Sequence, residues 1–289
     1  MMTTFMLDAE NIQAFYPLLP DEHILPDIEG GLVVLGAVEE NDDGTEKACG
    51  ALLMETLDDE TWNISWLLVA PDARGRGAGT QLMEEAEEVA AVTDKYLYCA
   101  FSEEVEQGKE GALYRLFANR GYLMEETKGC VYSITLEDMA QEEFFRRESK
   151  PAAGLKTLNE VSDVHLAAMN RDLAQKKRLY VPPISARWAM GDVSVVSMKD
   201  NTVEACAIFE QIAEDCVRLA FAYADPNASM RLPGMLLKAH GLLQKKFPPE
   251  TELVIPCVAD VGRKLTEKIL PGAKRVLQGY SALAKPEFE

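Results

Sequence analysis

The chain has 289 residues, a length that corresponds to about two domains of average size. Hydrophobic residues make up 47% and charged residues 27%, so the chain can bury a sizeable core. The formal net charge of −19 argues against binding to nucleic acid or to an anionic membrane surface, because both require a basic protein surface.

The excess negative charge is confined to the first half. Residues 1–150 hold 32 acidic and 11 basic side chains, whereas residues 151–289 hold 16 and 18. An acidic surface attracts amines, although a solvated face explains the same composition. Six scattered cysteines without a C-x-x-C pair predict neither a disulfide framework nor a zinc site. With no signal peptide and no long apolar run, we expect a soluble, cytoplasmic protein.

Hydrophobic periodicity in the first half predicts the order β-α-β-β-β-α-β-α-β. A turn is expected at residues 41–44, between the second and third strands. The predicted strands are Thr3–Leu7, Gly31–Val38, Lys47–Glu55, Trp62–Val69, Tyr96–Phe101 and Cys130–Leu136, and the predicted helices are Ala9–Leu18, Gly79–Ala91 and Glu110–Arg120.

The second half repeats this order, which predicts an internal duplication. The segment Pro71-Asp72-Ala73 matches Pro226-Asn227-Ala228, and the match continues without a gap to Gly79 and Gly234. We therefore expect an α/β protein with domains at 1–137 and 154–289 and a charged linker at 138–153. The predicted strands are Gly154–Leu158, Asp192–Met198, Val203–Glu210, Cys216–Tyr223, Glu252–Val258 and Lys274–Leu283, and the predicted helices are Glu160–Leu173, Met230–Phe247 and Gly262–Leu270.

A glycine-rich turn joins the strand Trp62–Val69 to the following helix. Its sequence, APDARGRGAGT at residues 70–80, predicts an anion site, because glycines let backbone N–H groups approach phosphate oxygens at a helix N-terminus. Arg74 and Arg76 add positive charge to a half that is otherwise acidic. The segment lacks the Lys-Ser/Thr pair of a Walker A motif, and its spacing differs from the dinucleotide-binding fingerprint.

The pattern Val69-x-Pro71-x-x-Arg74-Gly75-x-Gly77-x-Gly79 resembles the acyl-CoA pyrophosphate loop of the GNAT N-acetyltransferase superfamily. That family's core pattern, Arg/Gln-x-x-Gly-x-Gly/Ala, is met by Arg74, Gly77 and Gly79. The run from Leu116 to Tyr122 is similar to the family's Leu-Tyr-x-x-x-Gly-Phe segment. The resemblance covers the first half and, with the repeat, implies an α/β fold of two GNAT-like mixed-sheet domains in tandem.

The resemblance also implies a reaction. Acetyl-CoA would be the co-substrate, no metal would take part, and a primary amine would attack the thioester directly. The acceptor would be a small molecule or a peptide, and the acidic first half favours a cationic one. The pyrophosphate would be held by Arg74, Gly75, Arg76, Gly77, Ala78, Gly79 and Thr80, and Leu67, Leu68 and Val69 would splay from the next strand, pair with the pantetheine and polarise the thioester carbonyl.

The sequence departs from the family at the proton donor. The tyrosine that often protonates the leaving thiolate aligns with Phe117, which has no proton to give. Tyr114 lies three residues earlier and is the candidate replacement, or else an ordinary half-buried tyrosine. Candidates for the general base are carboxylates that are otherwise simply solvated: Glu55, Glu103, Glu104, Glu106 and Glu110.

The second half lacks this chemistry at the aligned loop. Ser229 replaces the arginine, Leu232 replaces the first essential glycine, and Pro233 removes an N–H donor. We therefore predict a degenerate second domain and one CoA site per chain. Residues 182–183 and Trp188 either line a substrate cleft or pack a connecting loop. An acyl-CoA sensor without catalysis, and transfer of an acyl group other than acetyl, remain alternative functions.

Overall fold

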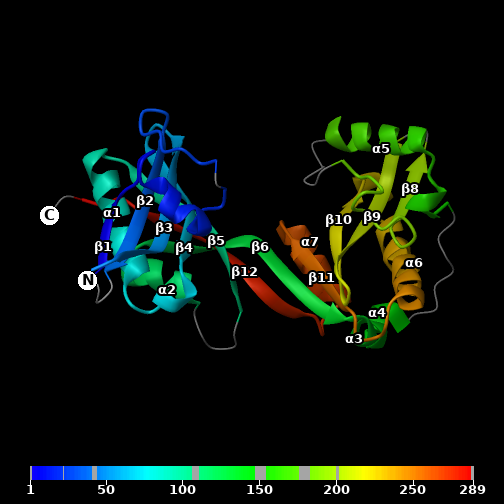
Figure 1. Ribbon diagram of the computed structural model, residues 1–289. Coiled ribbons are helices and arrows are strands. Elements are labelled where there is room, and N and C mark those ends of the chain that lie inside the picture. Colours follow the sequence, from blue (N-terminus) through cyan, green and yellow to red (C-terminus); the bar gives the residue numbers. More distant parts are fainter. Residues whose placement is uncertain are drawn as a thin grey trace. The chain divides into compact units, whose positions relative to one another are not determined.

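The computed structural model describes residues 2–21, 23–40, 44–105, 111–146, 154–175, 183–199 and 202–287. The chain separates into two compact units (Figure 1). The N-terminal unit comprises Met1–Thr127 together with Gln278–Glu289, and the C-terminal unit comprises Lys128–Leu277. Each unit is an α/β structure built on a mixed sheet, as the sequence predicts.

The sheet of the N-terminal unit has the strand order β1-β2-β3-β4-β5-β12. Strands β1 to β4 pair as an antiparallel meander, and β5 is parallel to β4. Five of the strands predicted in the first half lie in this sheet, with small shifts at their ends, and the sixth, predicted at Cys130–Leu136, is the longer β6 (Leu123–Thr135). The strands of this sheet are β1 (Met2–Met6), β2 (Leu32–Glu40), β3 (Glu46–Asp58), β4 (Thr61–Val69), β5 (Tyr96–Glu104) and β12 (Lys274–Ala284), the last of which was predicted in the second half.

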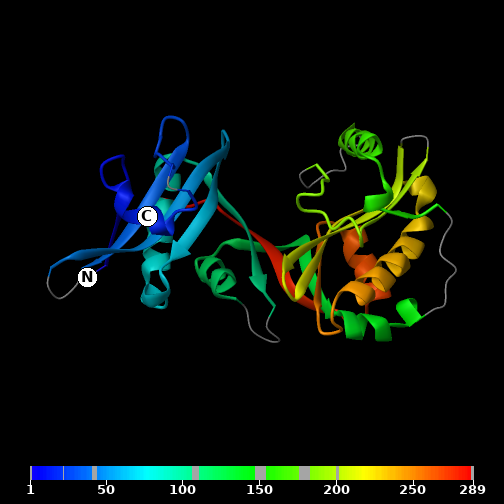
Figure 2. The same ribbon diagram turned by 45° about the vertical axis from the view of Figure 1, so that its right-hand side comes forward.

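Helical segments cover both faces of this sheet. A Cβ added to Gly36 would meet Phe15 of the 3-10 helix η1 (Ile12–Leu18), and one added to Gly50 would meet Leu82 of α1 (Ala78–Val92). Gly36 pairs with Ala51, the neighbour of Gly50, so η1 and α1 lie on opposite faces. Figure 2 shows α1 and α2 (Ala112–Asn119) in cyan and green-cyan beside the strands.

The helix predicted at Ala9–Leu18 is a 3-10 helix that begins only at Ile12. Pro17 lies inside it and has no N–H group, so an α-helical hydrogen bond is missing there. Residues 41–43 of the predicted turn between β2 and β3 lie outside the described residues.

The C-terminal unit has the strand order β6-β11-β10-β9-β8-β7. Strand β10 is parallel to β11, and the other pairs are antiparallel. The predicted strand at Gly154–Leu158 shortens to two residues, and the others are present. The strands are β6 (Leu123–Thr135), β7 (Lys156–Thr157), β8 (Val195–Lys199), β9 (Thr202–Ala213), β10 (Cys216–Ala224) and β11 (Glu252–Cys257).

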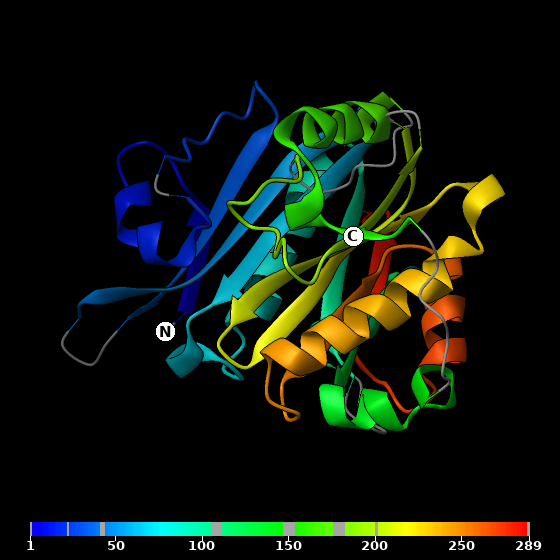
Figure 3. The same ribbon diagram turned by 90° about the vertical axis from the view of Figure 1, so that its right-hand side faces the viewer.

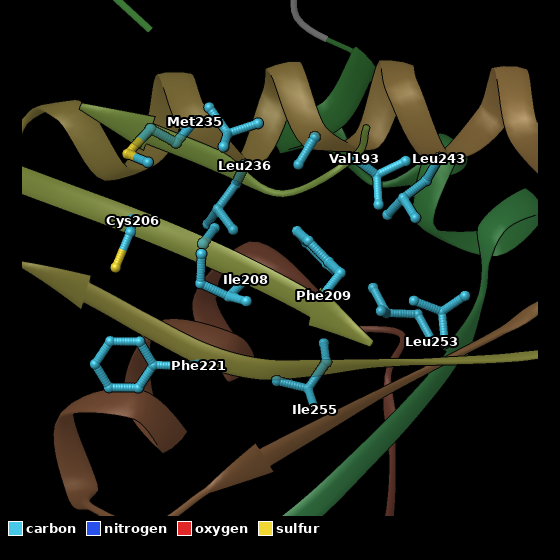
Figure 4. Packing of buried hydrophobic residues seen from close by; sticks show 14 of the residues in the cluster. Val193, Cys206, Ile208, Phe209, Phe221, Met235, Leu236, Leu243, Leu253 and Ile255 are labelled. Atoms are coloured by element: carbon cyan, nitrogen blue, oxygen red, sulfur yellow. The ribbon is translucent and has the colours of Figure 1, made fainter. Parts of the chain in front are cut away.

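The helices of the C-terminal unit pack on this sheet around a continuous apolar core. Figure 3 shows α6 running along the strands, and Figure 4 shows its residues Met235, Leu236 and Leu243 facing side chains of β9 and β11. The helical segments are α3 (Leu136–Gln141), α4 (Glu143–Arg146), η3 (Leu158–Glu160), α5 (Asp163–Gln175), η4 (Pro226–Ala228), α6 (Arg231–Lys246) and α7 (Asp260–Ile269).

The units differ from the domain boundaries expected at 1–137, 138–153 and 154–289. Strand β6 begins in the N-terminal unit and ends in the C-terminal unit, whereas β12 begins in the C-terminal unit and ends in the N-terminal unit. The segment expected as a linker contains α3 and α4, where Met139 and Phe145 are buried, so its first part belongs to the C-terminal core. Residues 147–153 lie outside the described part of the chain.

Five of the six cysteines are buried, and Cys216 is half-buried. Burial in apolar surroundings raises the pKa of the Cys99 thiol to about 12. These residues act as small apolar side chains of the two cores, as their scattered positions suggest. Trp188 packs against the C-terminal core and donates its indole N–H to the Pro183 carbonyl at 3.1 Å. These contacts favour packing of a connecting loop, the second of the two interpretations of Trp188. Residue 182 lies outside the described segments.

Candidate functional site

The parallel strands β4 and β5 part soon after they meet. They pair only at Thr61, Trp62 and Asn63 of β4. On its other side β4 stays paired with β3 up to Val69. In the part of the chain that the structure describes, no strand pairs with the β5-facing edge of β4 from residue 64 to residue 69. The predicted splay of Leu67, Leu68 and Val69 is therefore present, and among the described residues their main chain has no strand partner on this edge.

A β-bulge lies in β4 where this parting begins. The register with β3 shifts between Leu53↔Trp66 and Met54↔Ile64, which leaves Ser65 as the extra residue. The Trp62 indole N–H donates to Thr93 Oγ1 at the end of α1, whereas the Trp66 indole N–H donates to the Leu18 carbonyl of η1. The two tryptophans thus reach opposite faces of the sheet. Strict alternation would place both on one face, so the sequence pattern conceals this bulge.

The glycine-rich turn adopts a left-handed backbone before α1. Gly75 has φ 75° and Gly77 has φ 97°, values that glycine adopts without the strain that other residues incur. A Cβ added to either residue would meet no atom within 4 Å, so the space above the turn is open. The turn follows the short 3-10 helix η2 (Pro71–Ala73), which the amide of Ala73 closes by donating to the Ala70 carbonyl.

Backbone N–H groups at the start of α1 point out of the helix without an intrahelical acceptor. The Gln81 amide donates to the Gly77 carbonyl at 3.0 Å, which is the first bond of the helix. The amides of Ala78, Gly79 and Thr80 therefore precede the helical ladder. No side chain caps this end. Orphan amides at the positive end of a helix dipole attract anions, so this helix start is a candidate anion site.

The two arginines of the turn have protein partners. Arg74 donates Nε to the Val69 carbonyl at 3.1 Å, which ties the turn to the end of β4. Arg76 forms an ion pair with Glu39 of β2. A hydrogen bond from Lys47 lowers the pKa of Asp72 in the same region. The backbone, more than the arginine side chains, therefore presents donors to an incoming anion.

Helix α2 lies beside this turn. A Cβ added to Gly79 would come 3.6 Å from Val69 Cγ2 and 3.8 Å from Leu116 Cδ2, so the end of β4, the start of α1 and α2 meet there. Phe117 is 1% exposed and stacks on Phe101 of β5, with ring centroids 5.3 Å apart. A buried phenyl ring fills the position where the resemblance would place a proton donor.

The structure changes the set of candidate bases. Glu103 accepts the backbone amides of Leu113 at 2.6 Å and Tyr114 at 3.0 Å, so its carboxylate serves as the N-terminal cap of α2. Glu55 is exposed and accepts from Asn63 Nδ2 at 3.1 Å. Glu104 is exposed at the end of β5. Residues 106 and 110 lie outside the described segments.

Tyr114 is half-buried on α2, and its ring meets a residue that the sequence analysis missed. Tyr280 of β12 packs edge-to-face against Tyr114, with ring centroids 5.0 Å apart. Tyr280 comes from the end of the chain, and no spacing or motif links it to residues near position 114. Only the folded sheet brings the two tyrosines together.

Residues 32–122 match the family model of the acetyltransferase (GNAT) domain. This range spans β2 to the end of α2 and so includes the parted strands, the glycine-rich turn and Tyr114. The N-terminal unit contains a GNAT domain. A comparison with curated proteins gave no match.

Solved GNAT structures share the fold of the whole chain. A tandem GNAT protein from the clavulanic acid biosynthesis pathway superposes with a TM-score of 0.59 at 15% identity, covering 100% of both chains. A GCN5-related N-acetyltransferase from Sphaerobacter thermophilus gives 0.52 at 12% identity, covering 100% of this chain and 97% of that one. These likenesses confirm the predicted tandem of GNAT-like α/β domains.

The C-terminal GNAT-like unit retains the parted strands but changes the turn. Strands β10 and β11 pair only at Cys216, Val217 and Arg218 of β10, as β4 and β5 do at their start. The turn after β10 contains no left-handed residue: Ser229 has φ −55° and Met230 has φ −65°. Helix α6 begins at Arg231, whose guanidinium pairs with Glu204 at 2.8 Å.

Among the described residues, no group of three or more His, Cys, Asp or Glu side chains is arranged to hold a metal ion. No helix in the described segments has the length and apolar content that crossing a membrane requires.

Proposed function

We propose that the chain is an acetyl-CoA-dependent N-acyltransferase that moves an acetyl group to a primary amine by direct attack. The observation that carries this proposal is the left-handed glycine turn at Gly75 and Gly77, which opens α1 without a cap at the end of a parted strand. Such a turn offers the pyrophosphate a row of backbone donors. The GNAT domain at residues 32–122 supports the same function.

In this proposal the cofactor lies along the unpaired edge of β4. The amides from Arg74 to Thr80 hold the pyrophosphate, and the main chain of Leu67, Leu68 and Val69 pairs with the pantetheine. An amide of β4 near the bulge at Ser65 donates to the thioester carbonyl oxygen and stabilises the negative charge that develops there.

The reaction then needs two proton transfers. The neutral amine forms a bond to the carbonyl carbon, the C–S bond breaks, and the amine loses one proton to a base. Tyr114 gives its phenolic proton to the departing sulfur. Glu103 is occupied by two backbone amides, so Glu55, Glu104 or water accepts the proton from the amine.

The acceptor is a small-molecule or peptide amine, and a cationic one fits best. The excess of acidic residues in the first half supports this choice, because a negative surface raises the local concentration of cations. On α1, Glu84 and Glu87 already pair with Arg120, so part of this charge is neutralised within the unit. The cation preference therefore depends on the remaining carboxylates.

Calorimetric titration with acetyl-CoA, followed by thiol release over a panel of amines, tests the proposal. We expect saturable binding and thiol release that depends on the amine, with cationic amines the better substrates. The variant Gly77→Leu in the same assays distinguishes the turn from any other binding surface. Absence of binding to the folded wild-type chain would refute the proposal.

A non-catalytic acyl-CoA sensor is the second candidate. It is favoured by the buried phenyl ring of Phe117 at the position of the expected donor and by the use of Glu103 as a helix cap. A sensor would bind acetyl-CoA as tightly as an enzyme would, but it would release no thiol with any amine of the panel. The same pair of measurements therefore separates the two candidates.

A further inference from the structure

The last strand of the chain supplies a side chain to the candidate site of the N-terminal unit. Strand β12 leaves the C-terminal unit after Leu277 and lies next to β5 in the N-terminal sheet. Its residue Tyr280 is half-buried and contacts Tyr114 of α2 and Phe101 of β5. The proposed mechanism assigns Tyr280 no role.

These rings form one continuous aromatic cluster, which we call the β5–α2–β12 cluster. Phe101 stacks on Phe117 with ring centroids 5.3 Å apart, and it also contacts Tyr280 with ring centroids 5.7 Å apart. Tyr280 then meets Tyr114 at 5.0 Å with an angle of 66° between the rings. Tyr280 therefore connects the ring of Tyr114 to the stacked rings of half-buried Phe101 and buried Phe117.

The backbone of Tyr114 is fixed by a different contact. Its amide donates to Glu103 Oε2 at 3.0 Å at the first turn of α2. That bond sets the start of the helix but leaves the two side-chain torsions of Tyr114 undetermined. An edge-to-face neighbour restricts those torsions, because aromatic pairs prefer this geometry.

We propose that Tyr280 is a positioning residue for Tyr114 and that the C-terminal strand is thus part of the acyl-transfer site. The inference rests on the proposed function, in which Tyr114 Oη gives its proton to the CoA sulfur as the C–S bond breaks. Tyr280 keeps its own proton and forms no bond to substrate. Its ring holds the phenol of Tyr114 in the orientation for this transfer. A correctly oriented acid accelerates proton transfer far more than a mobile one does.

The test uses the full-length chain and five variants, one of which is Tyr114→Phe. Tyr280→Phe keeps the ring and removes the hydroxyl, and Tyr280→Ala removes both. Leu283→Ala is the matched control, because it truncates a side chain of the same strand on the opposite face, where Leu283 is 37% exposed. The double variant Tyr114→Phe/Tyr280→Ala tests whether the two tyrosines act together. Thermal unfolding and the acetyl-CoA dissociation constant are measured for each variant.

We expect Tyr280→Phe and Leu283→Ala to retain kcat within about twofold of the wild type. Tyr280→Ala should lower kcat by about 10²-fold, as loss of the acid itself would, with an unchanged dissociation constant for acetyl-CoA. The double variant should be no slower than Tyr114→Phe alone, because two residues that act as one unit are not additive.

Three results would overturn the inference. A large loss of kcat in Tyr280→Phe would assign the chemistry to the Tyr280 hydroxyl. Wild-type kcat in Tyr280→Ala would show that Tyr114 needs no such neighbour, and additive losses in the double variant would show that the tyrosines act separately. Failure of the proposed function is distinguishable, since the wild-type chain itself would then release no thiol with any amine.

Discussion

The turn before α1 and the turn before α6 begin alike and end differently. Both follow a strand, both open with a 3-10 helix at the matching segments Pro71–Ala73 and Pro226–Ala228, and both lead into a long helix. In the first, left-handed Gly75 and Gly77 delay the helix until Ala78. In the second, the backbone is already helical at Ser229 and Met230, and α6 begins at Arg231.

The difference shows that the fold accommodates a turn without left-handed glycines and without outward-pointing amides. At the position of Gly77, Leu232 packs against the C-terminal core, and its amide is taken by the Ser229 carbonyl at 3.3 Å. Pro233 has no backbone N–H to donate. The earlier helix start converts donors that would point outward into ordinary helical backbone. The parted strands are retained because they depend on sheet pairing and not on the turn.

The strongest test of this comparison is the number of CoA molecules that the chain binds. We expect calorimetric titration of the intact chain with acetyl-CoA to saturate at one equivalent. At a hundredfold excess over the dissociation constant, the N-terminal unit should gain about 2.7 kcal/mol of stability. Hydrogen exchange should show this protection in the N-terminal unit.

Two equivalents at saturation would contradict the comparison. A fragment of residues 154–289 is not a fair substitute for the intact chain. It lacks residues 130–135 of β6, which pair with β11 from Glu252 to Cys257. Without this strand the C-terminal sheet has an exposed edge, so absence of binding would have no single cause.

The next largest effect concerns Tyr114, the proposed proton donor to the CoA sulfur. Tyr114→Phe should lower kcat by about 10²-fold, because it removes the only proton that this side chain can give. The effect should be seen in kcat and not in the binding of acetyl-CoA. A kcat close to that of the wild type with a good acceptor would eliminate Tyr114 and leave protonation of the sulfur to water or to the substrate.

A smaller effect is expected from making the first turn resemble the second. Gly77→Leu copies Leu232 and should weaken acetyl-CoA binding by about 2 kcal/mol, or roughly 30-fold, since charge-assisted hydrogen bonds are lost. The control is Gly44→Leu: Gly44 has φ 79° and, like Gly77, no neighbour within 4 Å of an added Cβ. It imposes the same backbone strain in the β2–β3 connection. Equal weakening in both variants would argue against the turn.

The smallest expected effect is a pH dependence of the stability of the C-terminal unit. His240 of α6 is 6% exposed beside Phe145, and burial holds the pKa of its imidazole below 6.5. The unfolded chain therefore binds the proton more readily, so the stability of the C-terminal unit should fall as the pH drops through 6.5. Hydrogen exchange at pH 7.5 and 5.5 measures this change. His240→Phe should reduce it, whereas the exposed His165→Gln should leave it unchanged.

Much of the local structure followed from the sequence. Alternating apolar residues and turn signals located most strands to within a few residues, because each strand buries one face and ends at a polar break. The glycine-rich turn was identified because a left-handed backbone requires glycine, and that requirement is visible at Gly75 and Gly77 without the fold. The repeat at Pro71–Ala73 and Pro226–Ala228 was likewise a local signal, and both segments form the same 3-10 turn.

Other features of the site were decided by the tertiary structure. A bulge at Ser65 leaves an alternating pattern intact, and Glu103 looks like any solvated carboxylate until α2 begins beside it. The pairing of Tyr280 with Tyr114 depends on which sheet the last strand joins. A strand's own residues fix its face and its ends, but its partner is chosen by hydrogen bonding and packing with segments far away in the chain. The sequence by itself thus determined where the left-handed glycine turn lies, whereas the fold alone decided which aromatic residues surround Tyr114.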